Sequence, residues 1–177
     1  MTATLSRFFA LLSLACWAGT VATVVLLVGR RRWPAALDAV RDVALWLAWL
    51  VATVATLGSL YYSLVAHFTP CELCWYQRIC IYPLAAVLLV AAVRRSRDIW
   101  RYVLPQAAVG AAVAAYHTQL QAFPHQRTFC QLTNPCTIRY VWELGFVSLP
   151  FMALATCCFV IAMMLVAAGG HGGRTVA

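Results

Sequence analysis

Five long runs of residues without a charged side chain dominate this sequence. They cover residues 8–28, 43–66, 79–93, 102–120 and 144–168. A helix needs about 20 apolar residues to cross a hydrocarbon core about 30 Å thick. Four of the runs hold 19 to 25 residues, whereas the third holds only 15. The pattern predicts an all-α integral membrane protein with five transmembrane helices.

The charge content excludes the other broad classes of protein. Charged residues make up 10% of the chain and hydrophobic residues 64%, against about 25% charged residues in an ordinary soluble domain. A disordered chain would be poor in apolar residues. The net charge of +8 comes from thirteen Arg and no Lys, against five acidic residues. Because the Arg residues cluster between the apolar runs, they indicate membrane topology rather than nucleic-acid binding.

The distribution of Arg predicts the orientation in the membrane. Nine lie between the first and second runs, between the third and fourth, or after the fifth, and four lie on the opposite side. The side with more Arg is expected to be cytoplasmic, which places the N-terminus outside and the C-terminus inside. The first run is followed by Arg30, Arg31 and Arg32 rather than by a cleavage site of small residues, so it is expected to be a retained span. We also expect a short interfacial helix over 35–42 and an unstructured Gly-rich tail from residue 169.

Eight cysteines fall into two groups. Cys71 and Cys74 lie in the first predicted outside loop, and Cys130 and Cys136 lie in the second. In an oxidising compartment these pairs are expected to form two disulfides, with structural stapling of the loops or a four-Cys zinc site as alternatives. The lack of a His at ligand spacing argues against zinc, so we expect no metal. The other four cysteines lie inside the apolar runs and are expected to pack as small apolar residues: Cys16, Cys80, Cys157 and Cys158.

The two-residue spacer between Cys71 and Cys74 favours a redox role. A disulfide that closes so small a ring removes little chain entropy from the unfolded state, so it stabilises the fold weakly. Pairs with this spacing are common where thiol and disulfide interconvert. Cys130 and Cys136, with a wider spacing, fit a structural bridge equally well.

The short third run reaches a membrane-spanning length only when it is extended back to Cys74, which gives 20 residues. Trp75, Tyr76, Gln77 and Arg78 then form the outer turn of a helix. Arg78 shares a helix face with Cys74 and lies about 6 Å deeper. Its charge is expected to lower the pKa of the Cys74 thiol and to offer hydrogen bonds to an oxygen-bearing ligand. The alternative is an interfacial Arg that reaches toward lipid headgroups.

His117 lies near the outer end of the fourth run, about level with the first outside loop. Its near-neutral titration suits proton delivery to a reduced ligand. A polar residue at a helix end is the alternative.

These residues resemble the disulfide bond formation protein B family of quinone-dependent membrane thiol oxidoreductases, and they look most like its short-loop BdbC-type branch. The resemblance covers roughly residues 44–168. The sequence Cys-Glu-Leu-Cys-Trp-Tyr-Gln-Arg is a specific signal, whereas two cysteines at this spacing alone are not. The matching stretches are Gly58-Ser59-Leu60-Tyr61, Pro70 to Arg78, Tyr102-Val103-Leu104-Pro105, His117, Cys130 with Cys136, Gly145-Phe146 and Pro150-Phe151.

The resemblance implies an electron relay in a bacterial cytoplasmic membrane. A thioredoxin-fold thiol oxidase outside the membrane (DsbA- or BdbD-like) would reduce the Cys130–Cys136 disulfide, and electrons would pass to Cys71–Cys74 and then to a quinone. The quinone, a menaquinone or a ubiquinone, would lie beside Cys74 and Arg78, with Gln77 and His117 as further candidate contacts.

The family core implied by the resemblance is a four-helix bundle over 43–168. Residues 1–42 would add a first span and a basic linker, and 169–177 a cytoplasmic tail. This chain departs from the family by its extra first span.

Two other functions remain open from the sequence. A vitamin K epoxide reductase-like bundle also joins loop cysteines to a CxxC pair and a quinone, but there the loop pair comes first in the sequence. A non-enzymatic tetraspan-type protein with structural disulfides would leave Arg78 beside the CxxC pair unexplained.

Overall fold

The computed structural model describes residues 2–126, 130 and 134–169. In these residues, regular structure consists of helices and one isolated bridge between Glu143 and Val147. The expected all-α fold is confirmed. The elements are α1 (Thr2–Val28), α2 (Pro34–Leu64), α3 (Glu72–Arg94), the 3-10 turn η1 (Arg97–Ile99), α4 (Trp100–Ala122) and α5 (Leu149–Ala168).

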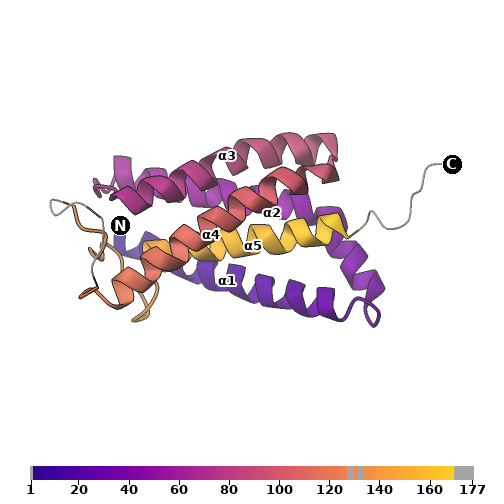
Figure 1. Cartoon of the computed structure of the whole chain (residues 1–177), viewed down its shortest axis with the longest axis horizontal. Helices are drawn as coiled ribbons and strands as arrows, with labels where there is room; N and C mark the ends of the chain where they lie inside the picture. The colour runs from indigo at the N-terminus through magenta and orange to yellow at the C-terminus, as the bar shows by residue number, and fades with distance from the viewer. Residues whose placement is uncertain (1, 127–129, 131–133, 170–177) are drawn as a thin grey trace.

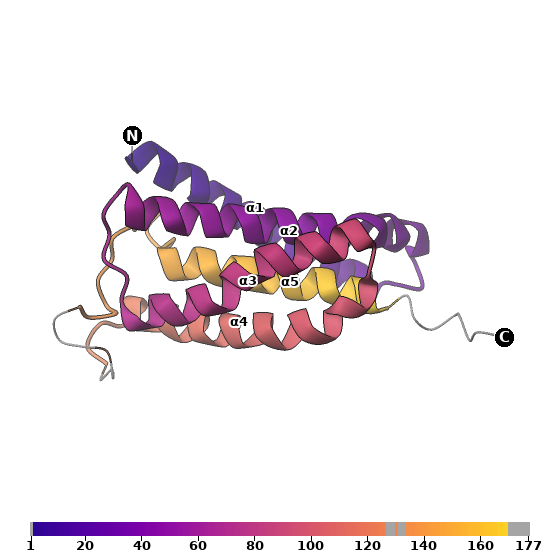
Figure 2. The ribbon, with the colours of Figure 1, turned by 90° about the horizontal axis from the view of Figure 1, so that it is seen from above.

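The five α-helices run lengthwise beside one another, and α5 lies among the others (Figures 1 and 2). The N-terminus and the two cysteine-bearing loops are at one end of the bundle, which we call the loop end. The α1–α2 and α3–α4 connections are at the opposite end. Because these connections carry the clustered Arg residues, we call this the arginine-rich end. The two ends therefore differ in charge as the sequence predicts, and which end faces the cytoplasm stays a prediction.

Four of these helices, α1, α2, α3 and α5, are long and apolar enough to cross a membrane. The chain is thus a multi-pass membrane protein. α4 is as long as α3, at 23 residues, but it is less apolar. Its polar residues include Gln106, His117, Thr118, Gln119 and Gln121. It runs beside α3 and α5 within the bundle (Figure 2).

Residues 35–42 do not form the separate interfacial helix that the sequence suggested. They are the first turns of α2, because Pro34 starts the helix and no helix-breaking residue follows for many turns. Arg41 fixes this polar segment to the end of α5, where its Nε donates to the Val166 carbonyl at 3.2 Å, and it also pairs with Asp38.

The fifth helix begins at Leu149 rather than at 144. Leu144 and Gly145 have φ angles of 55° and 80°, in the left-handed region that a helix cannot continue through. The turn they form is closed by two backbone hydrogen bonds between Glu143 and Val147, at 2.9 and 2.8 Å. Residues 170–177, most of the expected Gly-rich tail, lie outside the described part of the chain.

Small residues let the helices of the bundle approach closely. Ala44, Ala48 and Ala52 recur every fourth residue on α2 and are fully buried. On α4, a Cβ added at Gly110 would lie 3.0 Å from both Cys157 Sγ and Cys80 Cβ. Lipid tails are as apolar as side chains, so close packing of this kind, rather than hydrophobic burial, holds helices together in a bilayer. Cys80 and Cys157 thus lie in helix-packing positions.

Candidate redox site

Cys71 and Cys74 meet at the N-terminus of α3. Cys71 is the N-cap residue, with extended backbone angles, and Glu72 begins the helix. The one helical turn between the cysteines brings their sulfurs to 2.9 Å, where they form a thiol hydrogen bond. A disulfide bond is about 2.05 Å long, so the pair is a dithiol here. The predicted Cys71–Cys74 disulfide stays a prediction for the oxidised protein.

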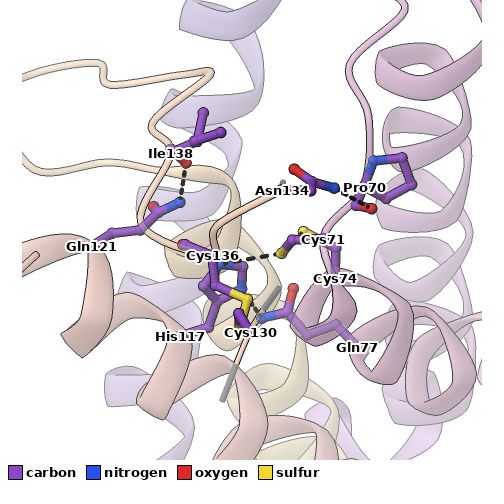
Figure 3. The surroundings of a disulfide bond; sticks show 10 residues. All are labelled: Pro70, Cys71, Cys74, Gln77, His117, Gln121, Cys130, Asn134, Cys136 and Ile138. Atoms are coloured by element: carbon purple, nitrogen blue, oxygen red, sulfur yellow. Dashed lines mark hydrogen bonds between the residues drawn. A yellow bond between two sulfur atoms is a disulfide. The ribbon is translucent and has the colours of Figure 1, made fainter. Parts of the chain in front are cut away.

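His117 of α4 lies between the two cysteine pairs (Figure 3). Its Nε2 is 3.7 Å from Cys71 Sγ and 3.0 Å from the backbone oxygen of Cys136. On the other side of the ring, Gln77 Nε2 donates to Nδ1 at 3.3 Å. This arrangement leaves the proton on Nε2, directed at the sulfur and the carbonyl. The side chain is 1% exposed, so its partners fix its position.

Hydrogen bonding stabilises the thiolate form of Cys71. It lowers the pKa of Cys71 to about 4, with the Cys74 thiol as the main donor and His117 as a second donor. Burial acts in the opposite direction but is outweighed. The sequence alone predicts the thiolate at Cys74, beside Arg78. The structure instead assigns it to Cys71, because the donors converge on that sulfur.

Cys130 and Cys136 are joined by a disulfide. Both are buried, at 7% and 1% exposure, in a cluster with Cys71, Leu73 and Leu120. The second loop is held over the first, since Asn134 Nδ2 donates to the Pro70 carbonyl at 3.0 Å (Figure 3). A four-Cys zinc site would need these two cysteines as thiolates, so the pair cannot bind zinc while it is a disulfide. The disulfide is covered, although it lies in a loop.

An elongated cavity of about 250 Å³ lies on the other side of Cys74. Its walls come from α1, α2, α3 and α5, and they are mostly apolar. Three stacked rings stand at its loop end: Phe68 lies between Tyr62 and Tyr140, with ring centroids 5.6 and 4.8 Å away. Cys74 lines this cavity and Cys71 does not. The two cysteines therefore face different partners.

Arg78 supplies the positive charge of the cavity. Its Nε donates to Ser59 Oγ at 3.1 Å, and its Nη2 donates to the Ser59 carbonyl at 3.3 Å and to Ser63 Oγ. The guanidinium also lies 5.1 Å from the centre of the Trp75 ring. These contacts anchor the guanidinium to α2 inside the bundle, so the alternative of an Arg that reaches to lipid headgroups does not hold.

The donor set of the cavity fits a quinone. A quinone ring is a flat apolar body with carbonyl oxygens that need hydrogen-bond donors, and it carries an apolar tail. The cavity combines a fixed guanidinium, the hydroxyls of Ser59, Ser63 and Tyr82, and the Cys74 thiol with long apolar walls. Small-molecule sites typically have this composition, with a few polar groups in an apolar cleft.

Sequence comparison identifies the family. The family model for "Disulfide bond formation protein DsbB" matches residues 41–170. The chain belongs to the DsbB family. It is 40% identical over 131 residues to disulfide bond formation protein C of Bacillus subtilis, which covers 73% of this chain and 95% of that protein. A probable disulfide formation protein of Coxiella burnetii is 39% identical, covering 72% and 88%. A probable disulfide formation protein C 1 of Bacillus cereus is 42% identical, covering 68% and 93%. No solved structure gives a significant match.

Membership of the DsbB family confirms the resemblance drawn from the motifs and supports a disulfide oxidoreductase that functions in disulfide bond formation. It favours this function over the vitamin K epoxide reductase-like and tetraspan alternatives. The match begins at residue 41, so α1 and the first turns of α2 lie outside it.

The structure brings the predicted residues together in two places. Cys71, Cys130, Cys136 and His117 meet at the loops, whereas Cys74 and Arg78 meet at the cavity. Gln77 reaches both, because it lines the cavity and bonds His117. His117 lies outside the wall of this cavity and between the cysteine pairs, and its contact with a quinone stays a prediction.

Sequence reasoning gave no role to Ser59, Ser63 or Asn134. Ser59 and Ser63 are four residues apart in an apolar run, a spacing that places both on one helix face. That polar pair was the signal for a buried partner of Arg78. Asn134 carries no comparable signal, because its partner is a backbone carbonyl 64 residues away.

Proposed function

We propose that this protein is a membrane thiol:quinone oxidoreductase that reoxidises a thioredoxin-fold thiol oxidase on the extracytoplasmic side of a bacterial cytoplasmic membrane. The observation that carries the proposal is that the two cysteines of the CxxC pair lie in different surroundings. Cys71 packs in the same buried cluster as the Cys130–Cys136 disulfide, whereas Cys74 lines the cavity together with Arg78. Electrons can therefore enter at one sulfur and leave at the other.

Electrons enter through the loop disulfide. A thiolate of the reduced partner attacks Cys130, the more exposed of the two sulfurs, and Cys136 leaves as a thiolate. The second thiol of the partner then breaks the mixed disulfide. The partner leaves oxidised, and Cys130 and Cys136 carry its two electrons as thiols. Because the loop disulfide is buried, docking of the partner must first shift the loop away from Pro70.

Transfer between the pairs follows from the contacts around Cys71. The Cys136 thiolate attacks Cys71 in the oxidised Cys71–Cys74 pair and displaces Cys74 as a thiolate. Cys130 then attacks Cys136, which re-forms the loop disulfide and releases Cys71. Thiols with a low pKa leave faster, and the hydrogen bonds that lower the pKa of Cys71 to about 4 make it a good leaving group.

A quinone bound in the cavity would accept the two electrons and two protons, with re-formation of the Cys71–Cys74 disulfide. Cys74 presents its sulfur to the cavity, and Arg78 would orient the ring by donating to a carbonyl oxygen. The apolar walls would exclude water from the reacting groups. His117, oriented by Gln77, would donate its Nε2 hydrogen bond to the Cys71 sulfur and so stabilise its negative charge.

The test is turnover by the purified full-length protein. It is mixed with a reduced thioredoxin-fold CxxC protein and a quinone, and both partner thiols and quinone absorbance are followed. We expect one quinone reduced for each partner disulfide formed. Cys74→Ser should abolish quinone reduction while still accepting electrons from the partner at the loop pair. Partner oxidation that proceeds without quinone consumption would overturn the proposal.

A further inference from the structure

The first helix, which lies outside the family match, forms one wall of the cavity. Phe9, Leu12, Ser13 and Cys16 of α1 all line it. Their spacing of three, one and three residues places them on one face of the helix. We propose that this face of α1 binds the apolar tail of the quinone and so sets the tail preference of the site. The inference rests on the proposed function, because it assigns a subsite of the same cavity.

The position of α1 is fixed by contacts with α2 and with the loop before α5. Tyr62 Oη donates to Ser6 Oγ at 3.0 Å, a buried hydrogen bond between α2 and α1. A Cβ added at Gly58 would lie 3.1 Å from Cζ of Phe9, so the ring rests directly on the backbone of α2. At the loop end, Arg7 Nε lies 3.6 Å from Glu143 Oε2 in an ion pair. These contacts make α1 a built part of the cavity.

Arg78 and the hydroxyl groups that surround it lie toward the loop end of the cavity, on α2 and α3. The cavity extends along α2 from Ser63 to Leu50, and Leu50 lies nine residues before Ser59. At 1.5 Å per residue the apolar part reaches about 13 Å deeper than Ser59. A ring held at Cys74 and Arg78 would therefore extend its tail toward the arginine-rich end.

The α1 face offers only apolar contact to a ligand in this deeper part. Ser13 is its one hydroxyl, and its Oγ donates to the Ala10 carbonyl within α1 at 2.7 Å. Phe9 packs level with Gly58, and farther along α1 Leu12 presents apolar atoms and Cys16 a thiol, which is only a weak hydrogen-bond donor. A tail gains little from leaving lipid for an apolar protein wall, so affinity here depends on shape and packing. A single change of shape at Leu12 should then alter tail binding.

Neighbouring leucines provide a matched pair of variants. Leu12 lines the cavity, whereas Leu11 is 61% exposed on the outer face of α1. Leu12→Phe crowds the wall, Leu12→Ala opens it, and Leu11→Phe makes the same change away from the cavity. A native thiol provides a second readout, since Cys16 lines the cavity and Cys158, partly exposed on α5, does not.

The experiment measures binding to the oxidised full-length protein without reductant. The probes are fully substituted quinones of one ring type with either a decyl or a methyl group at the same position, in a benzoquinone and a naphthoquinone series. Quenching of tryptophan fluorescence gives the dissociation constants. We expect both Leu12 variants to weaken binding of the decyl quinone by about tenfold and to change binding of the methyl quinone by less than about twofold. Leu11→Phe should bind both probes like the wild type.

Labelling of the wild-type protein gives a readout that does not depend on a substituted chain. Methyl methanethiosulfonate modifies free thiols, and peptide mass spectrometry reports the rate at each cysteine. The decyl quinone should slow modification of Cys16 and leave Cys158 unchanged, and the methyl quinone should protect neither. If quinones bind but Cys16 stays unprotected and the Leu12 variants keep the wild-type tail preference, the role of α1 is wrong and the redox function stands. If no quinone binds in either series, the quinone site itself is wrong, and this inference fails with it.

Discussion

Nε2 of His117 lies 3.7 Å from Sγ of Cys71 and so joins the CxxC pair to the neighbouring loop. The same nitrogen is 3.0 Å from the Cys136 carbonyl. One buried ring therefore contacts both cysteine pairs, and its position depends on the Gln77 amide behind it. Any movement of the loop that exposes the disulfide must break the bond to His117, so loop opening and the state of Cys71 are coupled.

The first prediction concerns the pH dependence of Cys71 in the reduced protein. Because its pKa is lowered to about 4, Cys71 stays a thiolate as the pH falls from about 8 to about 5, and it is protonated only below that range. The rate of its alkylation by iodoacetamide should therefore stay level and then fall through about pH 4. Because the pKa of Cys71 is lower in the folded protein than in the unfolded chain, the thiolate stabilises the reduced fold. This contribution is complete above the pKa of the unfolded chain and is lost as the pH falls toward the pKa of the folded protein.

His117→Ala tests the cause of this low pKa. It removes one of the donors to the sulfur, so the fall in alkylation rate should move to higher pH. His125→Ala is the control, because that side chain is exposed in the second loop. An unchanged profile in His117→Ala would mean that Cys74 alone holds the thiolate.

The second prediction separates the redox cysteines from the others. Cys71→Ser and Cys74→Ser should each abolish quinone reduction, since each removes one sulfur of the pair. At saturating quinone, the four cysteines inside the helices should tolerate Ala: Cys16, Cys80, Cys157 and Cys158. Cys80→Ala and Cys157→Ala leave small voids against Gly110, so each should lower stability by about 1 kcal/mol. Activity that survives Cys74→Ser, or that disappears in the four-Ala variant, contradicts the assignment.

The sequence predicted the helices because apolar length and charge clustering are local properties. The short third run was enough to place Cys74 at a helix N-terminus, and the spacing to Arg78 placed both side chains on one face. The predicted helix boundaries were wrong where backbone angles decide the position, as at the start of α5. The positive φ of Leu144 ends the turn before α5, and nothing in the apolar pattern marks that angle.

The partners of the site could not be predicted from the sequence, because they depend on how the helices pack. Arg78 bonds Ser59 across 19 residues, and His117 bonds Gln77 across 40. The thiolate was expected at Cys74 because Cys74 lies near a helix N-terminus and Arg78 is the nearest positive charge in the sequence. In the folded chain, the Cys74 thiol donates to Cys71, and His117 reaches the same sulfur from another helix, so the hydrogen bonds favour a thiolate at Cys71.

The third prediction concerns the entry of electrons. When the partner is supplied in its oxidised form, Cys136→Ala should accumulate a mixed disulfide, because the Cys130 thiolate attacks the partner disulfide and no Cys136 thiol is present to displace the partner. Non-reducing electrophoresis of the protein with an oxidised partner shows this as a band at the summed mass of the two proteins, lost on addition of reductant. Cys130→Ala should give less of it, since Cys136 is 1% exposed. A stronger band in Cys130→Ala would reverse the order of the two cysteines.

Asn134→Ala tests whether the loop must open for the partner. It removes the hydrogen bond that ties the second loop to Pro70, so the mixed disulfide with the partner should form faster in the Cys136→Ala background. Gln126→Ala is the control, because that exposed residue pairs only weakly with Gln119 at 3.4 Å. Slower trapping in Asn134→Ala would mean that the closed loop is itself the docking surface.

The last prediction concerns Arg78 and the geometry of its guanidinium. Arg78→Lys keeps the charge but loses the planar fork that bonds Ser59 and Ser63 at once. We expect the apparent Michaelis constant for quinone to rise by about 10- to 150-fold, which corresponds to the loss of 1.5–3 kcal/mol for a hydrogen bond to a charged group. Arg78→Gln should raise it further. Arg101→Lys, at the arginine-rich end, is the control. Exchange between the two cysteine pairs, measured without quinone, should change little, because the groups that contact Cys71 are Cys74 and His117. Slowed exchange with unchanged quinone kinetics would show that Arg78 acts on the thiols and not on the ligand.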